Sequence, residues 1–361
     1  MDLLRPLLTA FFSILAATLA AGLIGLPLLR RINVGQQVRD DGPQSHLKKS
    51  GTPTFGGLFF LIPLIGASIY NGLTDPASRV LLALGFLILG FALAGFIDDY
   101  IKVRITKKGL SVQQKSLIMF AVSVAFTVYY LYLAPQQPFF LVPFLSGNPS
   151  VGSAVPIVIT GFWKFLYGIF VVLYLFFVTN AVNITDGVDG LAASVTTISA
   201  TGLCAGAVLL AASLTNRYAA VKDSGSGAAY LAGIENSRSA AILAAAVAGG
   251  CIGFLFFNRH PAKVFMGDTG SQALGAALAG IALIIGAPWL ILFVGVIYII
   301  EAFSVMIQVA YFRRTGGKRL FRMSPIHHHF ELGGWSEEKI VFVFSLITLI
   351  GSALGVLIVR L

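Results

Sequence analysis

The sequence predicts an all-α, polytopic integral membrane protein with about ten transmembrane helices and both termini on the extracytoplasmic side. Hydrophobic residues make up 57% of the 361 residues and charged residues only 11%, which is more apolar side chain than a water-soluble protein of this length can bury. The apolar residues also occur in runs long enough to cross a bilayer, which takes about 20 residues. Residues 1–361 are therefore predicted to form a single transmembrane domain.

Ten apolar segments are predicted to span the membrane. The first is preceded by Arg5 and continues to Leu29 without a small-residue cleavage site, so we expect a retained span rather than a cleaved signal peptide. An even number of spans places both termini on the same side. In chain order the segments are 7–29, 55–71, 80–97, 116–134, 162–179, 190–213, 239–257, 271–286, 289–312 and 339–360.

The basic residues indicate which side of the membrane each connection faces. Most of the 25 Lys and Arg residues lie in alternate connections, and connections rich in these residues stay in the cytoplasm. The same bias accounts for the net charge of +10. The connections predicted to form the cytoplasmic face are 30–54, 98–115, 180–189, 258–270 and 313–338.

The two long connections on the opposite side, 135–161 and 214–238, are rich in Pro, Gly, Ser and Ala. They contain no cluster of titratable residues, so we expect simple connectors, the second of them partly mobile. Cys204 and Cys251 lie inside predicted spans, which favours neither a disulfide framework nor a thiolate metal site.

Carboxylates at the ends of several spans are the main indication of function. Asp98 and Asp99 directly follow an apolar segment, Asp186 and Asp189 share one Gly-containing connection, and Asp268 precedes another span. Ionisable residues at such positions are costly and are functional candidates by default. All five fall on the face that was assigned from positive charge alone, so this face is predicted to carry an active site.

Five carboxylates near a low-dielectric boundary would repel one another and require a compensating cation. Oxygen ligands without thiolates favour Mg²⁺ or Mn²⁺ over zinc. Asp268 by itself could instead be the N-cap of the helix that follows it. The grouping with the other carboxylates favours the metal-dependent site.

Two further strings on the same face carry polar groups. Residues 48–57, Lys-Lys-Ser-Gly-Thr-Pro-Thr-Phe-Gly-Gly, bring cations, hydroxyls and glycines to the start of a helix, a pattern that suits phosphate but is weak by itself. Three consecutive histidines, His327, His328 and His329, first suggest zinc, but adjacent side chains diverge and cannot easily converge on one metal. Imidazoles that donate hydrogen bonds to a phosphate fit a basic loop better, with His327 the first candidate.

Together these motifs resemble the phospho-N-acetylmuramoyl-pentapeptide transferases, the MraY family within the polyprenyl-phosphate N-acetylhexosamine-1-phosphate transferases. The resemblance covers nearly the whole chain. The aspartate motifs are shared with the wider superfamily, whereas residues 48–54 and 325–331 are similar to the muramoyl-pentapeptide branch. Phe55 departs from the methionine expected in many members.

The resemblance implies an enzyme of peptidoglycan synthesis in the bacterial inner membrane, with its active site facing the cytoplasm. Its substrates would be UDP-N-acetylmuramoyl-pentapeptide and undecaprenyl phosphate, and its products lipid I and UMP. It also implies dependence on Mg²⁺, for which Mn²⁺ can substitute, a homodimer surrounded by membrane lipid, and no nucleic-acid partner. A diphosphate needs charge neutralisation and an in-line nucleophile, which a metal and Lys residues can provide.

The resemblance also implies roles for individual residues. The metal ligands would be Asp268 and Asp186, with Asp98 and Asp99 at the lipid-phosphate end and Phe265 stacked on the uracil. The catalytic candidates are Asp98, Asp99, Asp268 and His327. The substrate-binding candidates are Lys49, Thr52, Lys115, Asn183, Asp186, Asp189, Asn258, Phe265, Gly267, Ser271, Gln308, His328 and His329.

The role of Asp98 stays open among a general base, a covalent nucleophile and a positional or electrostatic aid. A phosphate monoester has its second pKa near ~6, so the lipid nucleophile is already mostly a dianion at neutral pH. Little proton transfer is then needed from a base.

Two other functions compete with this hypothesis. A sister transferase that uses UDP-N-acetylglucosamine would share the aspartates and should differ around 325–331. An ion-coupled transporter would place its carboxylates near the membrane midplane rather than at one face. Glu301 is the one acid deep within a predicted span, and we expect it to be paired inside the bundle.

Overall fold

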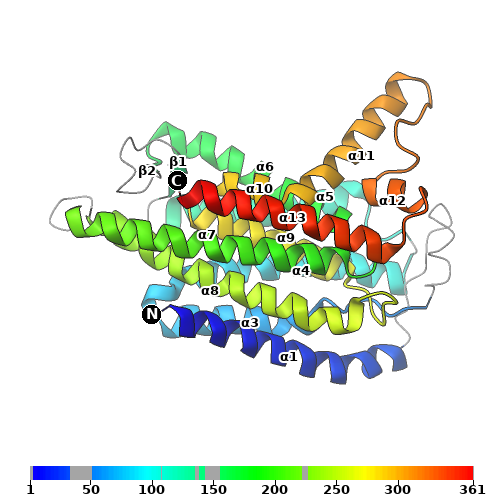
Figure 1. The fold of residues 1–361 in the computed structure, drawn as a ribbon, viewed down its shortest axis with the longest axis horizontal. Helices are drawn as coiled ribbons and strands as arrows, with labels where there is room; N and C mark the ends of the chain where they lie inside the picture. The colour runs from blue at the N-terminus through cyan, green and yellow to red at the C-terminus, as the bar shows by residue number, and fades with distance from the viewer. Residues whose placement is uncertain are drawn as a thin grey trace.

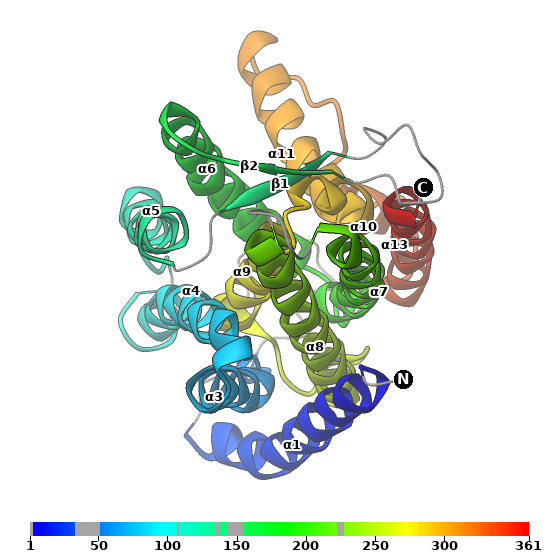
Figure 2. The ribbon, with the colours of Figure 1, turned by 90° about the vertical axis from the view of Figure 1, so that its left-hand side faces the viewer.

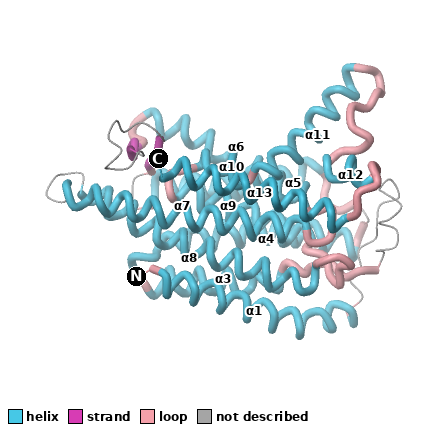
Figure 3. Tube along the Cα trace, viewed as in Figure 1, coloured by secondary structure: helices cyan, strands magenta, loops and turns pink. Residues whose placement is uncertain are grey.

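The structure is a computed structural model that describes residues 3–32, 51–106, 108–134, 138–142, 155–221 and 227–360. Long helices run side by side along the long axis of the molecule, and the two ends of the chain lie at the same end of this bundle (Figure 1). Most of the loops and α12 lie at the opposite end (Figure 3). The predicted all-α membrane fold is confirmed in class.

Each predicted span corresponds to helical structure. Eight helical segments in the described residues are long and apolar enough to cross a membrane, and the remaining two predicted spans correspond to the 17-residue α3 and the 18-residue α9. The number of spans and the side on which the termini lie stay predictions. The helices are α1 (Leu4–Arg31), α3 (Leu58–Thr74), α4 (Arg79–Arg104), α5 (Val112–Val128), α6 (Phe162–Thr185), α7 (Leu191–Val221), α8 (Gly227–Asn258), α9 (Gly267–Ile284), α11 (Val296–Arg314) and α13 (Glu337–Arg360).

Helix α9 forms the centre of the bundle. It packs against α4, α6 and α8, and Figure 2 shows it enclosed by them in end view. Every residue of α9 from Thr269 to Ile284 is buried, and most are Ala, Gly, Leu or Ile. Small residues allow backbones to approach closely. Gly57 and Gly270 are in such close contact, because a Cβ added to Gly57 would lie only 2.5 Å from the Cα of Gly270. This packing fixes the first turn of α9, and therefore Asp268, against its neighbours.

The structure corrects the ninth predicted span. Segment 289–312 is not one continuous helix, because the 3₁₀ turn η4 (Pro288–Leu290) leads into a short α10 (Ile291–Val294) and Gly295 separates this from α11. Glycine interrupts a helix at low steric cost. A larger residue at 295 would be crowded, because its Cβ would lie 2.8 Å from the carbonyl oxygen of Ile291. Beyond the break α11 leans away from the bundle (Figure 1).

Both outer connectors are more regular than predicted. Connection 135–161 contains an antiparallel pair of strands, β1 (Phe139–Val142) and β2 (Val155–Val158). The prediction of a loop at 214–238 is wrong for most of these residues, because α7 continues to Val221 and α8 begins at Gly227. Ala-rich sequence favours helix whether or not it lies in the membrane, so hydropathy underestimated both helices.

Three further short helical segments lie between the long helices. Helix α12 (Ile326–Glu331) contains the three histidines, and α5 continues as a π-helical turn, η2 (Tyr129–Leu133). The 3₁₀ turn η1 (Pro76–Ser78) precedes α4. Helix α4 also extends the third predicted span to Arg104, so Asp98 and Asp99 lie in its last turns rather than in a loop.

Candidate active site

Asp99 joins α4 to the N-terminus of α9. Its carboxylate accepts hydrogen bonds from the backbone nitrogens of Asp268 (3.1 Å) and Thr269 (2.8 Å) and from Thr269 Oγ1 (2.7 Å). The first N–H groups of a helix lack partners within it and attract negative charge. Asp99, which is buried, therefore caps α9 from a distant position in the sequence.

This arrangement corrects the alternative explanation of Asp268. Asp268 lies inside the first turn of α9, and the N-cap residue Met266 makes no side-chain capping bond. Gly267 has a positive φ of 75°, and a Cβ there would lie 2.5 Å from Asp99 Oδ2. A glycine is needed at 267 because both the backbone conformation and the nearby carboxylate exclude a larger residue.

Two lysines connect Asp268 to Asp98. Asp268 Oδ2 lies 2.8 Å from the Lys102 ammonium and 2.6 Å from that of Lys115. The same ammonium groups lie 2.8 and 3.4 Å from Asp98 Oδ2, while Asp98 Oδ1 accepts a 2.7 Å bond from the backbone nitrogen of Leu110. The result is a cluster of alternating charges contributed by α4, α5 and α9.

Asn183 completes the environment of Asp268 from the end of α6. Its Nδ2 lies 2.8 Å from Asp268 Oδ1 and 2.8 Å from Ser271 Oγ. The four predicted residues Asp98, Lys115, Asn183 and Asp268 are thus brought together from four helices. Lys102 was not among the predicted site residues, although its position one helical turn after Asp98 could have identified it.

The carboxyls of Asp268 and Asp186 differ electrostatically. Desolvation acts to raise the pKa of Asp268, but the ammonium groups of Lys115 and Lys102 outweigh it and hold that pKa well below its usual value. Desolvation also raises the pKa of Asp186, and the charges of Asp268, Asp99 and Asp189 raise it further. Asp186 therefore lies in a field that favours an added cation.

The side-chain oxygens in this part of the site fit the divalent cation that the family resemblance implies. Asp268 and Asp186 offer carboxylate oxygens, Asn183 offers an amide oxygen, and such hard oxygen ligands are what Mg²⁺ and Mn²⁺ prefer. The repulsion that raises the pKa of Asp186 would be relieved by positive charge at this place. Asp268 and Asp186 are the residues that would hold the ion.

Asp189 belongs to a second group on the same face. Its Oδ2 lies 3.2 Å from His260 Nδ1 and accepts a 3.0 Å bond from the backbone nitrogen of Ala262. Its own backbone nitrogen donates to Glu337 Oε2. Ligand atoms of Asp189, His260 and Glu337 lie within 4.8 Å of one another, but the imidazole makes this group less suited to Mg²⁺. These bonds join the connections after α6 and α8 to the start of α13.

Asn258 and Phe265 hold the remaining loops together. The Asn258 amide accepts from the backbone nitrogen of Gly190 (3.1 Å) and donates to the carbonyl of Val264 (2.9 Å), so both of its ends are engaged within the protein. The backbone nitrogen of Phe265 donates to Pro53, and its carbonyl accepts from Gly56. Segment 51–57, which includes Thr52, therefore lies beside Phe265; Lys49 lies outside the described residues.

The three histidines have three different partners, as their divergence predicted. His327 Nδ1 lies 3.0 Å from Glu301 Oε1, and His328 Nδ1 lies 3.0 Å from Glu331 Oε2. His329 Nδ1 accepts a bond from the backbone nitrogen of Arg322. The predicted pairing of Glu301 within the bundle is thus present.

Gln308 serves the loop that precedes the histidines. Its Oε1 accepts bonds from the backbone nitrogens of Leu320 (3.0 Å) and Phe321 (2.9 Å), and its Nε2 donates to the carbonyl of Phe321. These contacts hold the connection between α11 and α12. The substrate contacts proposed for Gln308, Phe265 and the other candidates stay predictions.

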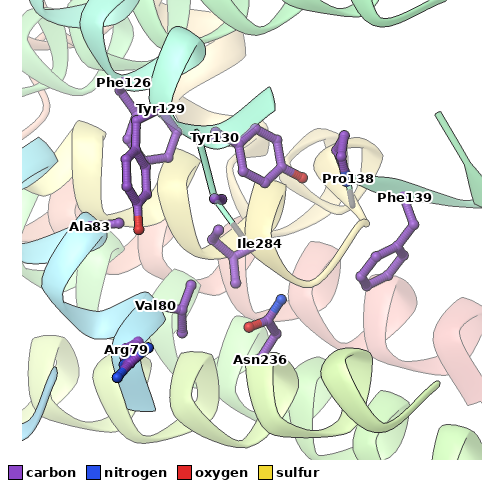
Figure 4. A pocket seen from close by; sticks show the side chains of 11 residues that line it. Arg79, Val80, Ala83, Phe126, Tyr129, Tyr130, Pro138, Phe139, Asn236 and Ile284 are labelled. Carbon is purple, nitrogen blue, oxygen red and sulfur yellow. The ribbon is translucent and has the colours of Figure 1, made fainter. Parts of the chain in front are cut away.

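One of the cavities in the described residues adjoins the site. A cleft of about 670 Å³ includes Asp189, His260, Arg259 and Lys263 in its lining and adjoins the loops described above. The pocket in Figure 4 lies at the other end of α4, around Arg79, and has a volume of only about 40 Å³. That pocket can hold water molecules but is too small for a nucleotide sugar.

Comparison with known proteins identifies the family. The family model described as glycosyl transferase family 4 matches residues 81–286. A phospho-N-acetylmuramoyl-pentapeptide-transferase of Acetivibrio thermocellus is 44% identical over 99% of this chain and 97% of its own length. Proteins of the same name from Pelotomaculum thermopropionicum and Listeria innocua are 42% and 39% identical, over 96% and 92% of both chains. These matches confirm the resemblance inferred from the motifs, and the chain belongs to the phospho-N-acetylmuramoyl-pentapeptide-transferase family within glycosyl transferase family 4.

Proposed function

We propose that this protein transfers phospho-N-acetylmuramoyl-pentapeptide from UDP-N-acetylmuramoyl-pentapeptide to undecaprenyl phosphate, giving lipid I and UMP. The observation that carries the proposal is the cluster in which Lys102 and Lys115 bridge Asp98 and Asp268 at one end of a membrane bundle. Full-length similarity to proteins named for this transfer supports it. The protein would act as a homodimer in the bacterial inner membrane, with this end facing the cytoplasm.

The two lysines would bind the phosphates of both substrates. Their ammonium groups lie between two carboxylates, where positive charge can stabilise the charge that develops on the transferred and leaving phosphates. Asn183 and the Asp99 cap hold Asp268 in place. These interactions position charge before the reaction begins, which is the main contribution a protein makes to phosphoryl transfer.

Asp98 would act by position and charge. The lipid phosphate, with its second pKa near ~6, reaches the site largely deprotonated. The Asp98 carboxylate orients the two lysines and is itself held by the backbone nitrogen of Leu110. It thereby fixes the cations that receive the attacking phosphate.

Asp268 and Asp186 would hold Mg²⁺ when it binds. The ion supplies charge neutralisation for the diphosphate. Mn²⁺ can substitute because it prefers the same oxygen donors.

A UMP-release assay with purified protein tests the proposed function. Undecaprenyl phosphate is supplied with either UDP-N-acetylmuramoyl-pentapeptide or UDP-N-acetylglucosamine, each with Mg²⁺ and with chelator. We expect UMP only from the muramoyl-pentapeptide substrate with Mg²⁺. Release from UDP-N-acetylglucosamine alone would assign the sister activity, and release from neither would refute the transferase. Cross-linking in native membranes checks the homodimer.

A further inference from the structure

Glu301 and His327 form a buried pair that the cluster around Asp268 does not include. Glu301 lies in the first half of α11, and His327 lies in α12. Both side chains are fully buried, with 0% relative exposure, and Nδ1 lies 3.0 Å from Oε1. A carboxylate can only accept a hydrogen bond, so His327 Nδ1 carries the proton when Glu301 is ionised.

The pair leaves two atoms without partners in the described part of the chain. Glu301 Oε2 and His327 Nε2 are both buried and make no hydrogen bond there. Buried polar atoms nearly always have a partner. A nitrogen left free at a substrate-binding face therefore indicates a partner that arrives with the substrate.

Gly187 shows where this nitrogen points. A Cβ on Gly187 would overlap His327 Nε2, which is its nearest neighbouring atom. Gly187 lies between Asp186 and Asp189 in the connection that carries the predicted nucleotide and metal residues. The free nitrogen of His327 therefore faces the turn where the diphosphate of the proposed substrate would lie.

We propose that Glu301 is a positioning residue that fixes the ring of His327 through Nδ1, so that Nε2 donates a hydrogen bond to a phosphate oxygen of the sugar-nucleotide substrate. This rests on the proposed transferase function. With protons on both nitrogens, the imidazolium and the Glu301 carboxylate carry no net charge together, which makes their joint burial less costly than that of either charge alone. Carboxylates orient histidines in the same manner in other active sites. Because Nε2 is buried in this structure, substrate binding must open access to this atom.

A double-mutant cycle tests the pairing. Glu301→Leu removes the acceptor, His327→Gln removes the donor, and Glu301→Gln keeps an oxygen for Nδ1 while removing the charge. We expect Glu301→Leu and His327→Gln each to lower kcat by about 10- to 100-fold, with the double variant no slower than His327→Gln alone. Glu301→Gln should retain more activity than Glu301→Leu, because it still orients the ring.

Tyr298→Phe is the matched control. Tyr298 is another buried polar residue of α11, and its hydroxyl pairs with Thr196 rather than with a histidine. Its loss should leave kcat close to that of the unmodified protein. If Tyr298→Phe lowers kcat as much as Glu301→Leu, or if the effects of Glu301→Leu and His327→Gln multiply, Glu301 has only a structural role and the proposal is wrong.

Nitrogen-15 NMR of histidine-labelled protein without substrate provides a readout that needs no turnover. We expect the His327 resonances to show a proton on Nδ1, and Glu301→Leu to change the His327 signals while leaving those of His260 in place. A bare Nδ1 in the unmodified protein would overturn the proposal even if the enzyme is active. If the protein releases no UMP from either sugar nucleotide, the transferase function fails while the NMR result still decides the pairing of Glu301 with His327.

Discussion

Two aspartates that cap helical turns lie near the two ends of α4, and they have different kinds of partner. Asp75, the N-cap of the 3₁₀ turn η1 that precedes α4, accepts bonds from the backbone nitrogen of Ala77 (3.1 Å) and from the hydroxyl of Ser78 (2.7 Å). Asp99, in the last turns, accepts its bonds from Asp268 and Thr269, about 170 residues along the chain. The first aspartate closes a local turn, whereas the second fixes one helix against another.

The basic residues near the two ends of α4 also differ in their surroundings. Arg79 at its start lines a small pocket beside Tyr130 and Ile284 (Figure 4). Lys102 near its end lies between the carboxylates of Asp98 and Asp268. The two ends of the helix thus allow matched removal of one positive charge, inside the candidate site at Lys102 and far from it at Arg79.

The largest effect is expected for Asp268→Asn. This change removes the carboxylate that holds both lysines, and with it a proposed metal ligand. UMP release should fall by on the order of 1000-fold, while the purified variant keeps its folded elution profile. Asp75→Asn is the control and should retain full activity. Unchanged Mg²⁺-dependent turnover by Asp268→Asn would remove this residue from the site.

Asp98→Asn should lower kcat by about 100-fold across the whole pH range in which the enzyme is stable. The reason is that Asp98 orients Lys102 and Lys115 rather than accepting a proton. A general base would behave differently, because raising the pH well above the second phosphate pKa near ~6 would restore the rate of the variant. A third outcome, release of about one UMP per active site from the unmodified enzyme without lipid, would indicate a covalent intermediate.

Lys102→Met should reduce kcat/KM for the sugar nucleotide by about tenfold, with Lys115 retaining part of the charge. Steady-state kinetics at saturating undecaprenyl phosphate measures this loss. Arg79→Met removes a cation from the other end of α4 and should leave kcat/KM unchanged. Equal losses in the two variants would show that the basic residues act through the fold rather than at the substrate.

The smallest change in activity is expected for Asp99→Asn, whose main effect is on stability. Asp99 accepts with both of its oxygens, whereas the amide keeps only one accepting oxygen and lacks the charge that favours the N-terminus of α9. The free energy of unfolding should fall by about 1 kcal/mol, measured as a lower Tm in detergent, with turnover reduced by less than in Asp98→Asn. If Asp99→Asn abolishes turnover at an unchanged Tm, the carboxylate is catalytic rather than a cap.

The sequence by itself determined the membrane class, the positions of the long helices and most of the candidate site. Apolar runs and charges are local properties of the chain, so segments such as 80–97 and 271–286 could be recognised without knowing their neighbours. Asp98 and Asp268 stood out for the same reason, because carboxylates at the ends of apolar runs are unusual wherever the helices pack, whereas Asn183 was implied by the family resemblance.

The tertiary structure alone decided which of these residues act on one another. The capping of α9 by Asp99 and the bridging position of Lys102 join helices that are distant in sequence, and the pairing of Glu301 with His327 joins two helices across a loop. Hydropathy contains no information about such partners, because they depend on how α4, α6 and α11 pack around the centre. The break at Gly295 was missed for a related reason, since a glycine within an apolar run interrupts a helix only where the packing of the surrounding helices favours it.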